Sequence, residues 1–454
     1  MPAGGTWTVQ NKVRPGAYIN FVSVPKPVGS MGNRGVVAVG MPMTWGPENE
    51  LIKLTGDELL NGASLAKVGV TAFDTEESLP YRVILAGCYT ALLYRTDTGG
   101  AKATATILAN TLTVSAKYKG STGNKITVVI VKDKPEEGNY TIQVLVNNLL
   151  QETFVCNEIT ELGDIESNFV EFTVVDGGAN IPTTAGITLT GGTNGTVSSD
   201  TYSTFWGLLD TQNFQCLAMY DITTSGLPAL IKDKIQIWRE QRGKKVQAVV
   251  YNYTAADYEG IISVNQGFKT STETVDTSLF PLWVASMTAG AEVNKSLTAA
   301  VVEDGVEIIN PILEDEIEDA LNAGRFVLSY RQDGAVCVEK DINTLHTFTV
   351  DKNYAFSKNR VIRCLDEIGN SCALIFNRNY AGKVDNDSIG RNQYKTELIA
   401  FIDTLVGIRA VTDFDGAQDV TVLPGESVDA VVVDLLVQPV DSMEKLYMTV
   451  NVNA

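Results

Sequence analysis

The sequence is poor in histidine, and its cysteines are widely spaced. Among 454 residues there is one histidine, His346, and there are six cysteines, none of them in a Cys-x-x-Cys pair. A single histidine excludes metal sites built from paired histidines, and it makes any Ser-His-Asp site depend on one residue. Because each cysteine lies in an apolar stretch, we interpret the cysteines as small buried side chains of a protein from a reducing compartment.

Sequence signals for a membrane-spanning helix, a signal peptide and a phosphate-binding loop are also missing. No uncharged apolar run reaches ~18 residues, so we expect no membrane-spanning helix. The first residues lack the basic start and apolar core of a signal peptide. Residues 120–125, Gly-Ser-Thr-Gly-Asn-Lys, come nearest to a phosphate-binding loop. Their glycines have the wrong spacing and a strand-like run follows them, so we interpret this segment as a turn.

No residues combine into a catalytic or metal site. Asp385, Asn386 and Asp387 ahead of Gly390 are weakly similar to a calcium loop, but no acidic residue closes the loop at its twelfth position. His346 lies in a strand-like or loop-like stretch, where an ordinary structural role explains it. Nowhere do a nucleophile, a base and an orienting group come together. We therefore expect that this protein is not an enzyme and that it binds no cofactor or metal.

Charge is abundant, mostly negative and unevenly placed. The net charge of −19 argues against nucleic acid or an anionic membrane as the main partner. Residues 301–320 contain eight acidic and no basic residues, whereas residues 352–395 contain eight basic and four acidic ones, a local balance of +4. Either these are solvated helix faces, or the basic face meets an acidic partner.

The chain is too long for one ordinary core and changes its pattern along its length. The patterns predict a multidomain α/β and α+β protein: an α/β core, an inserted β-rich domain of barrel or sandwich type, a C-terminal α+β domain and extended terminal arms. The predicted boundaries are 1–28 for the N-terminal arm, 29–98 and 199–345 for the α/β domain, 99–198 for the insertion, 346–440 for the C-terminal domain and 441–454 for the C-terminal arm.

Within the α/β domain, short apolar runs at 36–39 and 81–86 predict buried strands, with a helix at 56–60 between them. A β-α-β unit follows at 214–251, and its helix has Leu227, Ile231, Ile235 and Trp238 on one face. Further along, the sequence predicts a helix at 281–291, an acidic helix at 313–321 and a hairpin at 326–339. The insertion contains period-two runs at 125–131 and 140–146, which are typical of strands.

The C-terminal domain contains two helical patterns with apolar stripes. Each stripe is continuous, so each helix should pack on a core or a sheet. The stripes consist of Val361, Leu365, Ile368, Cys372 and Ile375 in the first helix, and of Tyr394, Leu398, Phe401, Leu405 and Ile408 in the second.

Both ends of the chain carry strand-like runs that have no partner strand next to them in sequence, apart from a strand-like run at 428–437 before the C-terminal arm. Residues 13–24 and 446–452 alternate from side to side, as strands do. A lone terminal strand frays unless it pairs with something, so we expect both arms to pair with other subunits of a polymer. The expected contact residues are Tyr18, Ile19, Phe21, Val22, Leu446, Tyr447, Met448 and Val450.

Several segments, in order along nearly the whole chain, carry a family resemblance. They are residues 14–21 (Arg-Pro-Gly-Ala-Tyr-Ile-Asn-Phe), 120–126, 285–291, 316–324, 339–348, 356–363 and 437–447. Through them the chain resembles the tail sheath proteins of contractile bacteriophage tails and of phage-tail-like bacteriocins, in particular the prophage type of Gram-positive bacteria. None of these segments is a catalytic signature.

The resemblance implies a structural subunit that forms stacked hexameric rings around a rigid tail tube. Such a sheath assembles in a metastable extended state and then shortens, driving the tube through the target cell envelope. The implied partners are other copies of the chain, the tail tube protein, and the baseplate and tail terminator proteins, without nucleic acid or membrane contact. The implied location is a virion tail or bacteriocin particle assembled in the bacterial cytoplasm. The arms would complete β-sheets in neighbouring subunits.

The resemblance also implies that the C-terminal domain lines the inner wall of the sheath. Together with the local positive charge, this makes Lys358, Arg360 and Arg363 the candidates for facing the tube, and Arg391 and Lys395 of the second helix compete with them. Two other functions stay open at this point: a different self-assembling tube or shell protein, and a soluble α/β enzyme with a β insertion.

Overall fold

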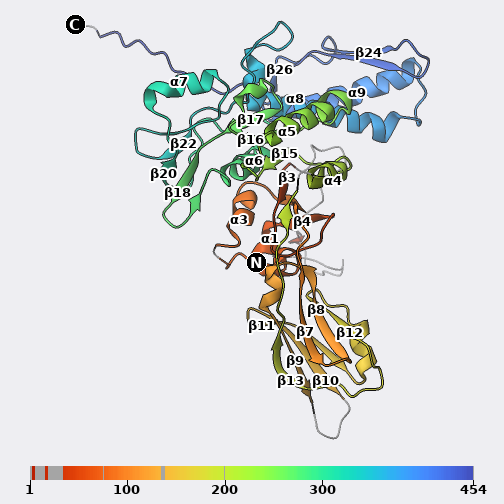
Figure 1. Ribbon diagram of the computed structural model, residues 1–454. Coiled ribbons are helices and arrows are strands. Elements are labelled where there is room, and N and C mark those ends of the chain that lie inside the picture. The colour runs from red at the N-terminus through yellow and green to blue at the C-terminus, as the bar shows by residue number, and fades with distance from the viewer. Residues whose placement is uncertain are drawn as a thin grey trace. The chain divides into compact units, whose positions relative to one another are not determined.

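The computed structural model describes residues 3–5, 16–18, 34–74, 76–133, 139–198 and 200–452 (Figure 1). The chain divides into two units, Met1–Gly32 and Asn33–Ala454. The described residues of the first unit form β1 (Ala3–Gly5) and β2 (Gly16–Tyr18), which pair in parallel. Tyr18 thus ends a strand that has a partner within the chain, whereas Ile19, Phe21 and Val22 lie outside the described residues.

A six-stranded sheet forms the centre of the second unit, in the order β17-β16-β15-β3-β5-β4. The first five of these strands run parallel, and β4 joins the edge antiparallel. The parallel strands are almost continuously buried, as expected where helices cover both faces. The strands are β3 (Val36–Met41), β4 (Leu51–Thr55), β5 (Thr90–Arg95), β15 (Cys216–Met219), β16 (Gln247–Tyr251) and β17 (Ile261–Val264).

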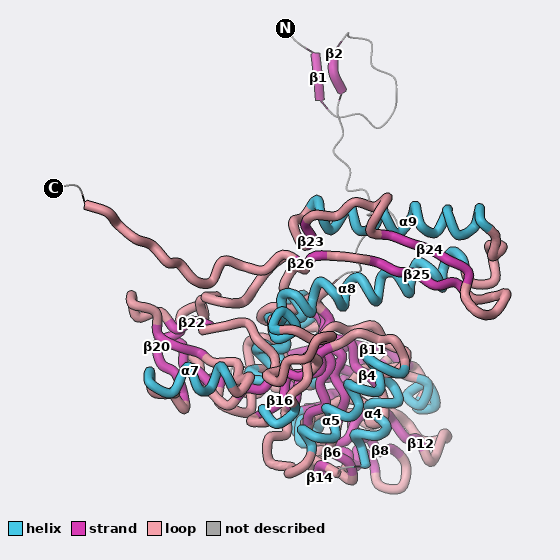
Figure 2. The backbone as a smooth tube through the Cα atoms, turned by 90° about the horizontal axis from the view of Figure 1, so that it is seen from above, coloured by secondary structure: helices cyan, strands magenta, loops and turns pink. Residues whose placement is uncertain are grey.

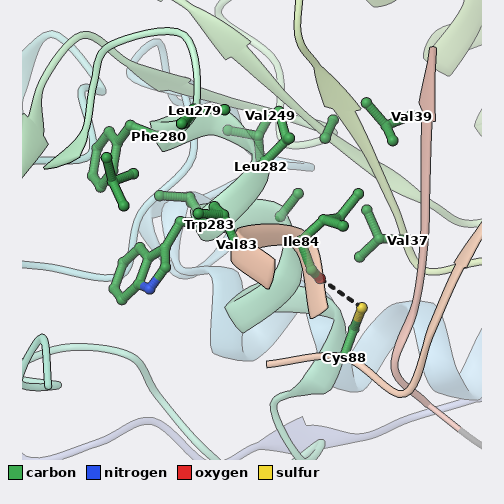
Figure 3. Packing of buried hydrophobic residues seen from close by; sticks show 14 of the residues in the cluster. Val37, Val39, Val83, Ile84, Cys88, Val249, Leu279, Phe280, Leu282 and Trp283 are labelled. Atoms are coloured by element: carbon green, nitrogen blue, oxygen red, sulfur yellow. Dashed lines mark hydrogen bonds between the residues drawn. The ribbon is translucent and has the colours of Figure 1, made fainter. Parts of the chain in front are cut away.

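Helices cover the two faces of this sheet. On one face α6 (Phe280–Gly290) and α3 (Leu79–Leu85) pack on side chains such as Val37 and Val39, as Figure 3 shows. On the other face lie α4 (Asp200–Leu209) and α5 (Leu227–Gln236), which continues as a π-helical turn, Ile237–Gln241. The segment β15-α5-β16 is the predicted β-α-β unit, and the predicted buried face of its helix is confirmed.

Smaller elements complete the α/β region. The acidic helix and the hairpin that follow the large sheet are found where the patterns place them. These elements are α1 (Gly56–Asn61), α2 (Ser64–Val68), β18 (Gly267–Thr270), β19 (Thr274–Val275), β20 (Gly305–Ile309), α7 (Glu314–Asn322), β21 (Leu328–Tyr330) and β22 (Val336–Val338).

The predicted strand at 81–86 is wrong, because this segment belongs to helix α3. Pro80 lies in the first turn of α3, where its missing N–H is not needed and its fixed φ favours the helix. The strand that pairs with β3 is β5, which begins at Thr90, nine residues after the predicted start at Tyr81. Short apolar runs do not by themselves distinguish a buried helix from a buried strand.

Two sheets form the inserted β-sandwich. One sheet has the order β11-β10-β9-β13, the other β12-β8-β7, and their inner faces share one apolar cluster. Residues Ser121–Lys125 form a 3-10 turn just before β9, which confirms the interpretation of this glycine-containing segment as a turn. The strands are β7 (Lys102–Leu108), β8 (Leu112–Lys119), β9 (Ile126–Lys132), β10 (Tyr140–Val146), β11 (Leu149–Cys156), β12 (Val170–Val174) and β13 (Thr184–Thr188).

A narrow neck connects the sandwich to the large sheet. The chain enters through β6 (Asp97–Thr98) and leaves through β14 (Thr196–Val197), which pair antiparallel. Trp45 from the α/β region is fully buried in the apolar cluster of the sandwich, with Tyr118 and Phe169 against its ring. Gly120, at φ +129°, lies so close that an added Cβ would be 1.9 Å from the Thr44 carbonyl oxygen. The two regions are therefore in direct contact at the neck.

The C-terminal region consists of two long helices and short strands. Figure 2 shows α8 (Asn359–Ile375) and α9 (Ser388–Gly407) beside β24 (Val420–Pro424) and β25 (Val431–Leu435). A second pair, β23 (Val411–Thr412) and β26 (Gln438–Pro439), follows α9 and precedes the terminal segment. No helix among the described residues has the length and apolar character needed to cross a membrane.

Candidate inter-subunit site

The hairpin β24–β25 has the features of a strand acceptor. Val420 and Leu435 pack with Tyr394 and Leu398 of α9, so one face of the hairpin belongs to a small core. On the other face Leu423 lies opposite Val432, and both side chains are exposed. No third strand joins this pair among the described residues. A two-stranded hairpin is marginal in isolation, and its free edges can accept another strand.

The C-terminal segment has the features of a donated strand. Residues 440–452 form neither helix nor strand (Figure 2). The four expected contact residues in this arm, Leu446, Tyr447, Met448 and Val450, are 69–88% exposed. Beyond Glu444 the described residues make no hydrogen bond or ion pair within the chain. An alternating apolar segment in this state has the chemistry that strand addition to an open sheet edge requires.

Before this exposed stretch, the chain is fastened to its own subunit. Gln438 and Pro439 pair with Thr412 and Val411, and the Val440 amide donates to the Ala410 carbonyl over 2.9 Å. Glu444 then forms an ion pair with Lys358 and accepts a hydrogen bond of 2.9 Å from the Thr298 hydroxyl. Burial of Glu444 opposes ionisation, but Lys358 outweighs this effect and holds the pKa of Glu444 below its ordinary value.

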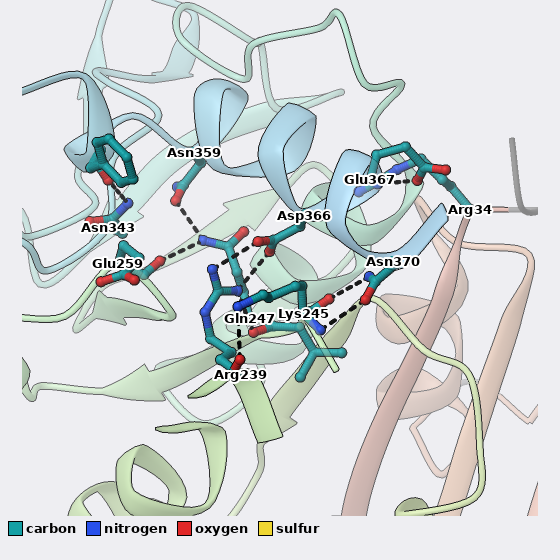
Figure 4. Close-up of polar contacts among 12 residues, drawn as sticks. Arg34, Arg239, Lys245, Gln247, Glu259, Asn343, Asn359, Asp366, Glu367 and Asn370 are labelled. Atoms are coloured by element: carbon teal, nitrogen blue, oxygen red, sulfur yellow. Dashed lines mark hydrogen bonds and ion pairs between the residues drawn. The ribbon is translucent and has the colours of Figure 1, made fainter. Parts of the chain in front are cut away.

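Helix α8 is joined to the α/β core by three ion pairs. Figure 4 shows two of them, Arg239 with Asp366 and Arg34 with Glu367. Arg239 donates to both carboxylate oxygens of Asp366 over 2.7 and 2.8 Å, which is the bidentate geometry that a guanidinium favours. The third pair joins Arg363 to Asp341 over 2.6 Å.

Amide side chains add neutral hydrogen bonds to this joint. Gln247 of β16 donates to Asn359 at the start of α8, and the Asn370 side chain exchanges hydrogen bonds with the backbone of Lys245 (Figure 4). Burial together with the like charge of Arg363 lowers the pKa of Arg34. The contacts between α8 and the core therefore include ion pairs and amide hydrogen bonds of defined geometry, beside the buried apolar side chains of the helix.

Two of the three residues expected to face the tube are buried within the subunit. The side chain of Lys358 is 4% exposed and that of Arg363 is 1% exposed. Both are used internally, Lys358 by Glu444 and Arg363 by Asp341 and by the Lys295 carbonyl. The expectation that these two residues present charge at the surface is wrong, because intramolecular carboxylates neutralise them. Arg360 keeps part of its side chain at the surface.

The two helices differ in which residues they bury. In α9 Tyr394, Leu398, Phe401 and Leu405 are buried, as predicted. In α8 the first half is enclosed on several sides, with Arg363, Asp366 and Glu367 buried beside the apolar residues. Val361 and Ile368 of the predicted stripe are buried, so this half packs as expected, but the apolar pattern does not reveal the charged residues that are buried in ion pairs beside them.

The residues that come nearest to a catalytic or calcium site in the sequence have ordinary structural contacts. His346 is partly exposed near Asp257, and its ring lies against the Thr344 carbonyl. No group of three potential metal ligands occurs among the described residues. Asp387 caps α9 by accepting from the Gly390 amide, and Asn386 donates to the Val428 and Ala430 carbonyls, which explains this polar cluster structurally.

The cysteines are free thiols, and five of the six are buried. Burial raises the pKa of Cys88 to about 11, and its thiol donates to the Ile84 carbonyl over 2.8 Å (Figure 3). These thiols pack as small apolar side chains, as the sequence indicates.

The predictions from the sequence do not include the contact between Thr298 and Glu444 at the start of the C-terminal arm, or the strand β24. Thr298 and Glu444 lie 146 residues apart, and nothing in their local sequence indicates that they meet. The alternation of Val420, Thr421 and Val422 is a signal for β24, although it is short.

Comparison with known proteins gives consistent matches along the chain. Three family descriptions match successive segments: "phage tail sheath protein beta-sandwich domain" at 98–194, "phage tail sheath protein central domain" at 195–344 and "phage tail sheath C-terminal domain" at 351–453. The phage-like element PBSX protein XkdK of Bacillus subtilis (strain 168) is 33% identical, with 99% of this chain and 100% of the relative covered.

Two solved structures agree with these matches. The sheath tail protein of Desulfitobacterium hafniense is 35% identical, with a TM-score of 0.79 and with 95% of this chain and 99% of that chain covered. The sheath tail protein Lin1278 of Listeria innocua is 31% identical, with a TM-score of 0.80 and coverage of 92% and 94%.

Proposed function

The chain belongs to the phage tail sheath family, and we propose that this sheath subunit polymerises as stacked hexameric rings around a tail tube and contracts to drive the tube through a cell envelope. The role of the chain is structural. Its further partners in this proposal are the tail tube, baseplate and tail terminator proteins, in a virion tail or bacteriocin particle assembled in the bacterial cytoplasm.

One observation carries the proposal: the same chain contains an exposed, strand-competent segment and an open hairpin. Residues 445–452 have no partner among the described residues, and the edges of β24–β25 are unpaired. When a segment of one subunit adds to the hairpin of another, the contact is heterologous, and it repeats into an open helical assembly where its rotation and rise do not close. Each added backbone hydrogen bond contributes about 0.5–1.5 kcal/mol.

Strand exchange also explains how the sheath would contract without its subunits separating. The exchanged strands would link all subunits into a mesh, while the rigid cores change their packing against one another. The driving free energy would be the difference between two core packings, multiplied over many subunits. This mechanism needs no nucleotide, and the turn at Ser121–Lys125 provides no phosphate-binding loop.

Deletion of residues 445–454 tests the proposal. We expect a folded, monomeric protein that no longer forms tubules, because the donated strand is lost while Glu444 and its contacts remain. Analytical ultracentrifugation and electron microscopy measure the two outcomes. Normal tubules from the truncated chain would contradict strand donation.

A face-specific pair of variants sharpens this test. Leu446→Ser, Met448→Ser and Val450→Ser together remove the apolar face of the segment, and we expect them to abolish tubules. Thr449→Ser and Asn451→Ser on the opposite face serve as the matched control and should assemble normally. Equal defects in both sets would mean that the segment acts through its backbone or length alone. Shells or other forms in micrographs would favour a different self-assembling protein, and substrate turnover would favour an enzyme.

We further propose that Arg360 faces the tail tube. It is partly exposed, unlike Lys358 and Arg363, although its Nε atom is buried and has no hydrogen-bond partner among the described residues. Exposed ion pairs contribute about 0–1 kcal/mol each, so Arg360→Glu should weaken assembly on the tube by only a few-fold. Sheath-only tubules should be unaffected, and Arg360→Gln should give an intermediate effect. If Arg391→Glu or Lys395→Glu alone weakens assembly on the tube, α9 is the tube-facing helix instead.

A further inference from the structure

The start of the C-terminal arm meets a buried positive charge. The Lys358 side chain, immediately before α8, is 4% exposed, and its ammonium group pairs with Glu444 and lies 3.7 Å from Asp441. An uncompensated charge at such a depth is strongly unfavourable, whereas a charge paired and hydrogen-bonded is tolerated. Both carboxylates come from the arm, so the arm itself neutralises this lysine.

The Glu444 carboxylate is held by a second group from a different part of the fold. The Thr298 hydroxyl donates to Glu444 and accepts a hydrogen bond of 2.9 Å from the Asp341 amide. The Asp341 carboxylate in turn accepts from Arg363 of α8, from Asn359 and from the Leu297 amide. Glu444 is therefore connected to the rigid start of α8 through both Lys358 and Thr298.

The character of the chain changes at Glu444. From Gln438 to Glu444 it is fastened by the β23–β26 ladder, by the Val440 amide and by the Glu444 carboxylate. From Lys445 onwards the described residues are exposed and make no hydrogen bond or ion pair within the chain. Glu444 is the last point at which the subunit holds its own arm.

We propose that Lys358, Thr298 and Glu444 form an anchor that keeps residues up to 444 on their own subunit, so that a neighbouring subunit receives only residues 445–454. This inference rests on the proposed function, in which the C-terminal arm is donated. A fully extended segment of this length spans about 34 Å, which sets the reach between the donor and the acceptor hairpin.

The anchor also determines how tension enters the subunit. A pull on the donated strand reaches Glu444 first and passes to α8 and the α/β core through Lys358, Thr298 and Asp341. Without the anchor, the same pull would act on the two-residue ladder between β23 and β26, which would peel pair by pair. The anchor therefore allows a mesh of donated strands to transmit load while the arm stays at a fixed origin.

Amide hydrogen exchange of the full-length subunit tests the anchor independently of polymerisation. Glu444→Ala removes the carboxylate but leaves Lys358 buried without its main partner. Lys358→Met combined with Glu444→Ala removes both charges and separates loss of the anchor from misfolding. Glu166→Ala, the same change at an exposed position of the sandwich, is the matched control.

We expect exchange of the Gln438 and Val440 amides to become about tenfold faster or more in the double variant, with no change in the control. Tubules of the double variant should form but become shorter than those of the control after equal shear. Unchanged exchange in the double variant would overturn the anchor, even if tubules are normal. Accelerated exchange in a chain whose wild type forms no tubules would support the anchor and contradict the proposed polymer instead.

Discussion

Two peripheral regions attach to the same α/β core in different ways. The β-sandwich is held by a two-residue ladder and by the burial of Trp45 and Leu65 in its apolar cluster, and its ion pairs to the core, Lys119 with Glu48 and Lys125 with Glu77, are partly exposed. Its one buried ion pair at the neck, Arg95 with Asp97, is local, since the residues are two positions apart. This pair organises the neck backbone: Asp97 accepts from the Met43 and Gly195 amides, and Arg95 donates to the Lys119 carbonyl.

Helix α8 buries apolar side chains, and it is attached in addition through buried long-range charge pairs. Arg239 and Asp366 are 127 positions apart in sequence, and Arg34 and Glu367 are 333 apart. Apolar contacts tolerate small displacements, whereas buried ion pairs lose much of their stabilising effect when geometry is lost. The sandwich therefore has an apolar cluster of its own that meets the α/β region at the neck, whereas buried ion pairs fix the position of α8 on the core.

Breaking a long-range pair should give the largest effect. Arg363→Met leaves the Asp341 carboxylate buried without its cation, and we expect the free energy of unfolding to fall by about 3 kcal/mol, as measured by urea denaturation. This value lies at the low end of the range for buried pairs because Arg363 binds Asp341 through Nη2 alone, and its Nε and Nη1 atoms have no partner. Arg360→Met on the same helix is the control and should cost under about 1 kcal/mol. Equal losses would show that the buried Arg363–Asp341 pair stabilises the protein no more than a partly exposed arginine of the same helix, and would contradict its role in holding α8.

Removing the sandwich should give a smaller effect. Replacing residues 102–192 by a short Gly/Ser linker preserves β6, β14 and the Arg95–Asp97 pair, and loop length itself costs little. The main loss is the burial of Trp45. We expect the free energy of unfolding to fall by about 2–3 kcal/mol, because this apolar surface becomes exposed. Tubules should still form. Trp45→Gln in the shortened chain should improve its solubility, whereas an unfolded product would show that the sandwich belongs to the core.

Acidification should give the smallest effect, confined to the arm. The pKa of Glu444 is lowered in the folded chain, so its contribution to stability is present above the ordinary value of 4.5 and is lost as the pH falls through the lowered pKa. The groups around it are Lys358, Asp441, Lys340 and the hydroxyls of Thr298 and Ser442.

Hydrogen exchange of the Gln438 and Val440 amides, corrected for the intrinsic rate, measures this pH effect. Protection should decrease below about pH 4.5 in the wild type. Glu444→Gln keeps the shape of the side chain but cannot ionise, so it should show weaker protection with little dependence on pH. The same pH dependence in this variant would assign the titration to another group, such as Asp441.

Much of the fold was predictable because it depends on apolar periodicity. The β-α-β unit, the strands of the sandwich and the stripe of α9 all follow from patterns of period two or near 3.6. The exception, α3, shows the limit of this approach, because Tyr81 to Ala86 is a short apolar run and only Pro80 indicated a helix. The exposed alternating segment at 446–452 was equally visible in the sequence.

The sequence by itself determined the multidomain α/β and β-rich organisation, the strand-competent C-terminal end and the resemblance to sheath proteins, since these features are local or repeat along the chain. Only the tertiary structure decided which charges are available. The sequence predicts that Lys358 and Arg363 are cations at the surface. In the structure they are neutralised inside the subunit by the carboxylates of Glu444 and Asp341, which are distant in sequence. The physical reason is that the state of a charged side chain depends on partners brought close by folding, and no pattern within the helix records where those partners lie.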